Sequence, residues 1–154
     1  MKKLLLLCCA VCVLYVVSCK KEEKRPSMRT EMITEGKWQV TALGSDSKVN
    51  KQTTTTDLYV TMPDCMKDNL LTFNMDGSCT TDEGEQKCDP DAPQTYGGVS
   101  WKFMTADTQL ELTDTSGSIV YDILSLNDTG LVLQYVKEVE DATITTTTKY
   151  RHIH

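Results

Sequence analysis

Apolar and polar residues alternate along most of the chain, in short runs separated by turn residues. A period of two is the pattern of a β-strand that buries one of its faces. No apolar stripe with the helical period of 3.6 residues is long enough to predict a helix. The runs therefore predict about nine strands, at Lys37–Gly44, Asp57–Met62, Leu70–Met75, Ser78–Asp82, Val99–Thr105, Gln109–Thr113, Ser118–Leu126, Leu131–Glu138 and Ala142–His152.

The connections between these runs carry strong turn signals. Tight hairpins are predicted at Met75-Asp76-Gly77-Ser78, Asp114-Thr115-Ser116-Gly117 and Asn127-Asp128-Thr129-Gly130. Consecutive hairpins produce an antiparallel up-and-down meander, and closure into a barrel removes the edges of such a sheet. We therefore expect an all-β fold, a closed barrel of about eight strands.

Two details refine this expectation. The alternation changes phase within Ser118–Leu126, which predicts a β-bulge in that strand. Two runs of four threonines occupy different contexts, so we interpret Thr53–Thr56 as a polar loop and Thr145–Thr148 as part of a half-polar strand.

The amino terminus has a different pattern. Lys2 and Lys3 precede an unbroken 14-residue apolar run, from Leu4 to Val17. A membrane-spanning helix needs about 20 apolar residues, so the run is too short to cross a bilayer. It predicts a secretion signal over residues 1–18. Residues 19–33 are rich in charge and contain Pro26, which predicts a solvated tether, and residues 34–154 form the barrel domain.

The signal ends on a recognisable sequence. Val16-Val17-Ser18-Cys19 resembles the lipobox of bacterial lipoproteins, which implies cleavage before Cys19 and acyl chains on that cysteine. An ordinary secretion signal that ends near a cysteine is the alternative. Because each buried CH₂ group contributes about 0.8 kcal/mol, several chains on one residue hold a protein at a membrane without a spanning helix. The membrane is thus an expected partner, through the lipid on Cys19.

Lys20-Lys21-Glu22-Glu23 follows the lipid cysteine directly. It resembles the export signal of Bacteroidetes lipoproteins, a lysine followed by paired acidic residues. The resemblance implies a lipid anchor in the outer membrane with the domain exposed at the cell surface. The periplasmic leaflet remains the alternative.

Charge and length exclude several classes of function. The chain has 154 residues and a net charge of −6. Nucleic acids and anionic membrane surfaces are bound through clustered Lys and Arg, so the acidic balance argues against both. The length leaves room for a single modest domain after the signal.

The barrel domain contains Cys65, Cys79 and Cys88, which allow one disulfide and one remaining thiol. We expect Cys65 to pair with Cys88, closing a loop worth about 3 kcal/mol, with Cys79 as a small buried residue. Pairing of Cys79 with Cys88 is the alternative. No Cys-x-x-Cys occurs and no histidine lies near these residues, which argues against a zinc site or a redox pair.

Two motifs together carry a family resemblance. Gly36-Lys37-Trp38 matches the Gly-x-Trp that opens lipocalin and fatty-acid-binding barrels. The pattern Cys-x-x-Asp-Asn-x-x-Thr-Phe-x-x-Asp-Gly from Cys65 to Gly77, with the later Cys88, is similar to the lipocalin-like lipoproteins of Bacteroidetes. The likeness covers residues 34–150. It implies a lipocalin-like β-barrel in which the matching cysteines, Cys65 and Cys88, form the disulfide.

Residues for catalysis are sparse. The histidines are His152 and His154, which we interpret as part of a frayed polar terminus. No Gly-x-Ser-x-Gly, His-Glu-x-x-His or phosphate-binding glycine loop is present. Asp82-Glu83-Gly84-Glu85, with Asp89 and Asp91, matches no calcium loop and is interpreted as a solvated acidic loop. We expect a protein that is not an enzyme, with no cofactor and no metal site.

Two functions remain. In the first, the barrel binds a small apolar or amphipathic ligand. In the second, the same side chains fill the barrel, and the domain is a non-catalytic structural or interaction module with an envelope protein as its partner. An eight-stranded barrel has a size that allows either outcome. The candidate ligand-binding residues are those expected to face inward, namely Trp38, Phe73, Trp101, Phe103, Tyr121, Leu133 and Tyr135.

Overall fold

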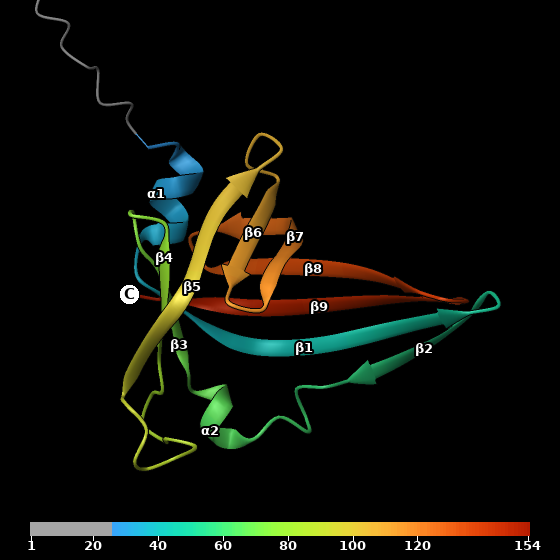
Figure 1. The fold of residues 1–154 in the computed structure, drawn as a ribbon, viewed down its shortest axis with the longest axis horizontal. Coiled ribbons are helices and arrows are strands. Elements are labelled where there is room, and N and C mark those ends of the chain that lie inside the picture. The colour runs from blue at the N-terminus through green and yellow to red at the C-terminus, as the bar shows by residue number, and fades with distance from the viewer. Residues whose placement is uncertain (1–25) are drawn as a thin grey trace, which may run out of the picture.

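The computed structural model describes residues 26–154, which form two short helices and nine strands (Figure 1). The expected signal peptide, the lipidation site Cys19 and the first part of the tether lie outside the described residues. In chain order the elements are α1 Met28–Thr34, β1 Lys37–Val49, β2 Gln52–Asp57, α2 Asp64–Lys67, β3 Leu70–Phe73, β4 Ser78–Asp82, β5 Thr95–Met104, β6 Gln109–Asp114, β7 Gly117–Asn127, β8 Gly130–Val139 and β9 Ala142–Ile153. Within this part of the chain, neither helix is long or apolar enough to span a membrane.

The strands form one antiparallel sheet that closes on itself. From β3 to β9 each strand pairs with the next, and β1 pairs with both β3 and β9. Trp38 lies opposite Leu71 of β3 on one side and opposite His152 of β9 on the other. The predicted all-β up-and-down meander, closed into a barrel of about eight strands, is confirmed, and β1 and β3–β9 form its wall.

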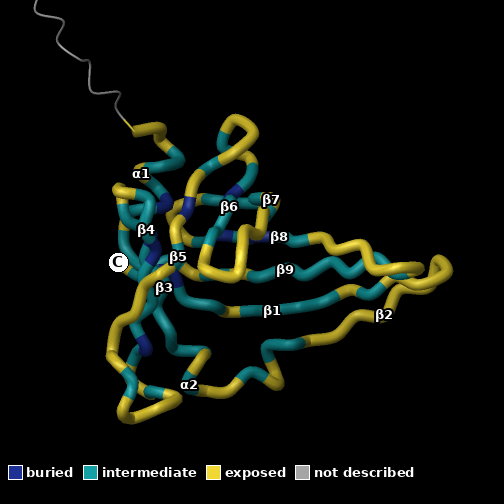
Figure 2. Tube along the Cα trace, viewed as in Figure 1, coloured by how far each residue is buried: buried dark blue, intermediate teal, exposed yellow. Residues whose placement is uncertain are grey.

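β1, β8 and β9 continue well beyond the closed barrel, and β2 pairs with the outer half of β1. Figure 1 shows these four strands projecting to one side of the molecule. In Figure 2, β2 and the outer part of β8 are exposed, whereas the outer part of β9 is half-buried. We call this four-stranded extension the arm. It consists of β2 together with residues 44–49, 135–139 and 142–147.

The predicted turns and bulge are present. The three hairpins join β3 to β4, β6 to β7 and β7 to β8. The pairing of β7 with β8 shifts between Ile123 and Ser125, which confirms the bulge. A second bulge lies in β1 between Val40 and Ala42, opposite β9. This second bulge was not predicted, although the apolar residues Val40 and Leu43 are out of alternating phase with each other in the sequence.

One predicted strand was wrong. Asp57–Met62 forms turns after its first residue, whereas the preceding Thr53–Thr56, predicted to be a loop, lies in β2. Four consecutive threonines show no alternation, so the sequence pattern contained no signal for this strand. Pairing with β1 through a two-residue turn at Asn50 and Lys51, both with positive φ, sets the strand instead.

The structure also places a helix where a solvated tether was expected. α1 begins at the N-cap Ser27, whose side chain accepts a hydrogen bond from Thr30 N, and it buries Ile33 completely. The indole Nε1 of Trp38 donates to Ile33 O at 2.8 Å. A seven-residue helix with one buried apolar residue is too short to produce a helical period, which is why the sequence did not reveal it.

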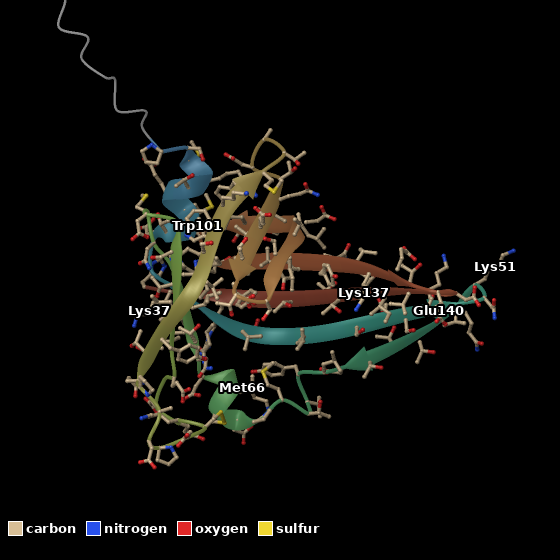
Figure 3. The ribbon with its side chains drawn as sticks, in the orientation of Figure 1. Lys37, Lys51, Met66, Trp101, Lys137 and Glu140 are labelled. Carbon is tan, nitrogen blue, oxygen red and sulfur yellow. A yellow bond between two sulfur atoms is a disulfide. The ribbon has the colours of Figure 1, made fainter. Side chains whose placement is uncertain are left out.

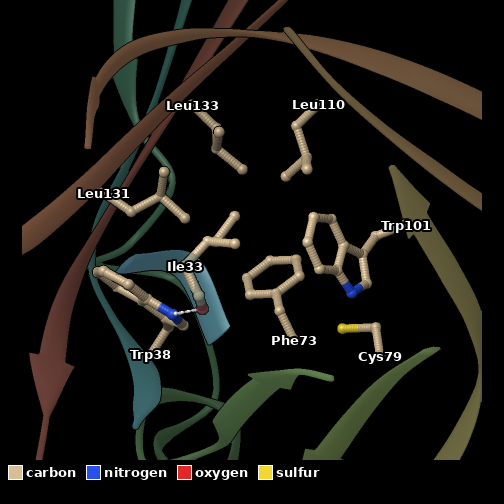
Figure 4. Close-up of a cluster of buried hydrophobic side chains, with 8 residues drawn as sticks. All are labelled: Ile33, Trp38, Phe73, Cys79, Trp101, Leu110, Leu131 and Leu133. Carbon is tan, nitrogen blue, oxygen red and sulfur yellow. Dashed lines mark hydrogen bonds between the residues drawn. The ribbon is translucent and has the colours of Figure 1, made fainter. Parts of the chain in front are cut away.

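The core lies at the end of the barrel that α1 covers, which we call the closed end. Its side chains come from α1, β1, β3, β4, β5, β6 and β8, and Figure 4 shows them converging. Phe73 meets Trp101 edge to face at 5.6 Å, and Trp101 meets Phe103 in the same way at 5.4 Å. The buried residues are Ile33, Trp38, Phe73, Cys79, Trp101, Leu110, Leu131 and Leu133. This half of the barrel is filled by its own side chains.

Candidate functional site

An apolar cavity of about 260 Å³ opens at the other end of the barrel, above the core. We call it the mouth pocket. Trp38 lies among its lining residues, and β1, β3, β4 and β9 supply its walls. The segment between β2 and β3, which includes α2, also contributes side chains. The lining residues are Trp38, Val40, Leu43, Met62, Met66, Asn69, Leu71, Thr81, Thr148 and Tyr150.

The bulge in β1 shapes this pocket. Val40 lies opposite Tyr150, and Leu43 lies opposite Thr148, although three positions separate them along β1. Directly opposed residues of an antiparallel pair face the same side of the sheet, so both Val40 and Leu43 face inward. Without the extra residue at Thr41, strict alternation would turn one of them outward.

α2 places Met66 at the rim of the pocket and is tied to the barrel in several ways. The Cys65–Cys88 disulfide, with a Cα–Cα distance of 5.1 Å, joins α2 to the loop between β4 and β5. Gln39 Nε2 donates to Lys67 O at 3.0 Å. With its amide nitrogen turned toward Cys65 O, at 2.9 Å, Asn69 forms a further link. These contacts fix a segment that has little regular structure of its own.

Glu83 anchors the other side of the disulfide loop. It is buried, and its Oε2 accepts a hydrogen bond from Cys88 N at 3.1 Å. Asp68 Oδ2 accepts from the backbone N–H groups of Glu85 and Gln86, both at 2.8 Å. The acidic segment is therefore held by its own Glu83 and by Asp68, which follows α2, and it is more ordered than a freely solvated run.

The mouth pocket is electrically neutral. No Lys, Arg, Asp or Glu is among the described residues that line it, and its polar groups are those of Asn69, Thr81, Thr148 and Tyr150. Burial raises the pKa of Tyr150 well above its usual value, with smaller contributions from nearby Tyr121 and Cys79. The Tyr150 hydroxyl therefore stays protonated at physiological pH and can donate a hydrogen bond.

The seven residues predicted to contact a ligand lie in different places. Trp38, Phe73, Trp101 and Leu133 belong to the buried core, and Phe103 and Tyr121 pack against it. Tyr135 contacts Tyr121, with ring centroids 5.9 Å apart. Trp38 is the member of this set that lines the mouth pocket.

Sequence reasoning missed most of the pocket. Val40 and Leu43 were missed because the bulge between them was not predicted, and Met62 and Met66 belong to a segment with no regular period. Leu71 and Tyr150 lie in strands that the sequence predicted, Leu70–Met75 and Ala142–His152, but alternation alone cannot separate a residue that fills a core from one that lines a cavity. That difference depends on the position of a residue along the barrel axis.

Other depressions lie on the described surface, and one of about 280 Å³ lies in the arm between β1, β2 and β9. Two more lie elsewhere. One, of about 280 Å³, lies at the turn between β6 and β7 and is lined by Val99, Leu112, Ile119 and Tyr121 with the turn residues. The other, of about 660 Å³, is polar and lies beside the disulfide loop. Its lining includes Gln39 and Arg151, whose guanidinium donates to the Gln39 amide oxygen.

The carboxyl terminus is not the frayed end that the sequence suggested. His152 stacks on Trp38, and its Nδ1 lies 3.0 Å from Asp128 O. Its Nε2 contacts Glu35 O. The last strand is therefore held at the closed end by α1 and by the turn between β7 and β8.

The disulfide and the remaining thiol lie where the sequence placed them. Cys65 pairs with Cys88, and Cys79 is a buried free thiol with 3% of its surface exposed. Burial raises the pKa of Cys79 from its ordinary 9.0 to about 12, so it is not a nucleophile at neutral pH. Within residues 26–154, no group of three His, Cys, Asp or Glu residues is arranged to hold a metal ion.

Comparisons with known proteins give one family and a set of remote structural likenesses. Residues 18–151 match the family described as Domain of unknown function (DUF5004). No curated protein matches the chain. Similar solved structures include complexes of bovine odorant binding protein with a selenium-containing odorant, at 16% identity, and with undecanal, at 19%. Both have a TM-score of 0.41 and cover 87% of this chain and 78% of the other.

Proposed function

The chain belongs to the DUF5004 family of domains of unknown function, and we propose that its barrel binds a small, uncharged apolar or amphipathic molecule in the mouth pocket. The observation that carries this proposal is the neutral, apolar lining above a filled core. Concave apolar sites with a few placed polar groups are typical of small-molecule binding. The Tyr150 hydroxyl and Thr148 supply such groups in this pocket.

The lining also restricts the chemistry of the ligand. A carboxylate or ammonium group placed in an apolar site without an opposite charge loses several kcal/mol of hydration. No charged side chain lines the pocket to compensate for that loss. Its volume of about 260 Å³ is below the ~300–1,000 Å³ of pockets for drug-sized ligands. A compact neutral molecule fits both restrictions.

The binding test uses the mature chain with Cys19→Ser, so that no lipid is attached. Octanol and octanoate are matched probes, because they have the same chain length and differ in charge. We expect thermal shift and calorimetry to detect octanol, and octanoate to bind at least about tenfold more weakly. Native mass spectrometry of the protein purified from its own host is the second measurement, and it should reveal a co-purifying small molecule.

Two matched variants locate the site. Leu43→Trp fills the mouth pocket and should abolish binding, whereas Ile119→Trp fills the depression between β6 and β7 and should leave it unchanged. Circular dichroism checks that both variants fold. Equal binding by the two variants, or no probe bound and no molecule co-purifying, would refute the mouth pocket as a ligand site.

We further propose that this binding protein is an envelope lipoprotein. The lipobox-like sequence before Cys19 and the lysine and acidic residues after it support an outer-membrane anchor with the barrel at the cell surface. Mass spectrometry of the amino-terminal peptide should find acyl chains on Cys19. Protease added to intact cells should then remove the domain. A lipid on Cys19 with full protection from protease would place the protein on the periplasmic leaflet.

The interaction-module function remains the second candidate because of one specific observation. Four of the seven residues predicted to contact a ligand are used to fill the core. If the ligand tests fail, the outer surface becomes the functional part of the domain. Affinity capture from its own envelope, with the lipidated protein as bait, would then identify a protein partner.

A further inference from the structure

The two edges of the arm differ in their chemistry. β2 forms one edge, and among the described strands it pairs with β1 alone. All six of its residues are exposed, and the four between Gln52 and Asp57 are threonines. Residues 135–139 of β8 form the other edge, because the pairing of β7 with β8 ends at Gln134. Figure 3 shows Lys51, Lys137 and Glu140 toward the tip of the arm.

Charged residues on an edge strand discourage pairing with another chain. The β8 edge has this protection, since it includes Lys137 and Glu138 and is followed by Glu140. The central part of β2 has neither charge nor proline, and its pairing with β1 is continuous from Gln52 to Asp57, without a bulge. One arm thus combines a protected edge with an edge that is open to another strand.

The turn between β1 and β2 determines which backbone groups of β2 are free. Val49 and Gln52 close a two-residue turn and therefore form a hydrogen-bonded pair. Hydrogen-bonded and non-bonded positions alternate along an antiparallel pair. The N–H and C=O groups of Thr53, Thr55 and Asp57 therefore point away from β1, toward the open edge.

We propose that this edge pairs with a second copy of the chain, with β2 antiparallel to β2 and Thr54 opposite Thr54 at a two-fold axis. In this register Thr53 lies opposite Thr55 of the second copy, and their outward backbone groups can form hydrogen bonds. Cross-strand threonine pairs are favourable in antiparallel sheets. Each copy has one open edge, that of β2, and the pairing covers the open edge of both copies. The assembly therefore closes at two copies.

Charge complementarity favours this register and a second copy as the occupant. With Thr54 on the axis, Lys51 of one copy lies opposite Asp57 of the other, and the symmetry repeats this contact. Both residues are exposed at opposite ends of β2. Shifting one β2 strand by two residues along the other would still place outward backbone groups opposite each other. It would, however, separate Lys51 from Asp57 of the other copy.

The expected association is weak. Stable protein interfaces bury about 1,200–2,000 Å² of surface in total. Two paired six-residue strands bury less surface than that, as transient contacts do. The dimer should therefore depend on concentration. A lipid anchor that confines the protein to one membrane would raise its local concentration.

Sedimentation velocity on the mature Cys19→Ser chain, from micromolar to about millimolar concentration, tests the proposal. We expect a shift from monomer to dimer, with no larger species. Thr55→Pro removes an outward N–H and leaves the backbone bonds of β2 to β1 in place, since proline is tolerated at such edge positions. It also removes the hydrogen bond from Thr55 Oγ1 to Asp46 Oδ1 of β1. It removes two hydrogen bonds per dimer and should weaken association by at least about tenfold.

Glu138→Pro is the matched control, because Val139 and Ala142 close a similar turn and Glu138 N–H points to the opposite edge of the arm. It should leave the dimer unchanged. Lys51→Asp is a second variant. Aspartate tolerates the positive φ of this position, and it would lie opposite Asp57 of the other copy. The two like charges should weaken the dimer. A monomer at every concentration, or equal effects of Thr55→Pro and Glu138→Pro, would overturn the proposal.

Discussion

The imidazole of His152 stacks on the indole of Trp38, with ring centroids 4.8 Å apart and planes inclined by 24°. The two residues are direct partners in the pairing of the first strand with the last. Trp38 also holds α1 through Ile33 O, and His152 contacts Glu35 O just after the helix. This pair therefore closes the barrel and fastens the helix over its closed end at the same point.

Replacing His152 should loosen this closure. His152→Ala removes the stacked ring and the contacts with Asp128 O and Glu35 O. The expected loss is about 2–3 kcal/mol in the free energy of unfolding. Urea denaturation followed by tryptophan fluorescence measures it. His154→Ala is the control, since His154 is exposed and meets the His152 ring edge-on, and it should change stability by less than about 0.5 kcal/mol.

Gly36 should be intolerant of any side chain. Its φ is +73°, and a Cβ atom there would lie 2.6 Å from Ile153 O. Gly36→Ala should therefore destabilise the fold by about 2–4 kcal/mol, through both backbone strain and a clash with β9. In contrast, Gly97→Ala meets only ordinary contacts at 3.7 Å and should be close to neutral. Thermal unfolding of the two variants makes the comparison, and equal effects would show that the Gly36 geometry is unimportant.

The disulfide should stabilise the rim of the mouth pocket as well as the whole domain. Its cysteines are separated by 23 positions in the sequence, and loops of this size correspond to about 3 kcal/mol in the chain-entropy model. The double variant Cys65→Ser and Cys88→Ser should lose about that amount. Hydrogen exchange should increase first in residues 58–69 and 83–94, which the disulfide joins. An equal increase in hydrogen exchange throughout the domain of the double variant would contradict this local role.

Cys79 should make the fold sensitive to alkaline pH. Burial raises the pKa of its thiol to about 12 in the folded protein, so the folded state retains a proton that the unfolded state releases above about pH 9. Stability should then be fully present below pH 9 and fall between pH 9 and 12, by up to about 1.4 kcal/mol per pH unit from this group. Tyr150, whose pKa is also raised by burial, adds to the loss at the upper end of that range.

Cys79→Ala separates the two contributions. It removes the thiol and should make the decline of stability with pH less steep between pH 9 and 10, even if it lowers stability at every pH. Urea denaturation at a series of pH values gives this slope directly. A slope that is identical in the variant and the parent protein would show that the thiol ionises equally in both states.

The strand content was accessible from the sequence because its signals are local. The alternation through Leu71 and Phe73 and the turn at Asp76-Gly77 depend on neighbouring residues, and both were interpreted correctly. α1 and β2 were not accessible in this way. A seven-residue helix and a run of four threonines carry no period, and they adopt their structures by packing on Trp38 and by pairing with β1.

The candidate site was less predictable than the fold. The sequence identified inward-facing aromatic residues, but Phe73 and Trp101 fill the closed end, whereas Leu43 and Met66 shape the pocket. The bulge at Thr41 and the docking of α2 decide which inward positions remain unfilled. The docking of α2 leaves no periodic trace, and a single change of phase between Val40 and Leu43 does not reveal which inward positions stay unfilled.

The sequence by itself determined most of the strands with their hairpins and the alternation that turns one face inward, because these follow from residue type and short-range spacing. The secretion and lipidation signals are predictions of the same local kind. The family resemblance favoured the pairing of Cys65 with Cys88 over the alternative of Cys79 with Cys88. Tertiary structure decided how β1 meets β9, where the barrel is filled and where it stays open, and that four strands continue into an arm. Those features depend on contacts between residues more than 100 positions apart, such as Trp38 and His152, whose energies arise when the chain closes on itself.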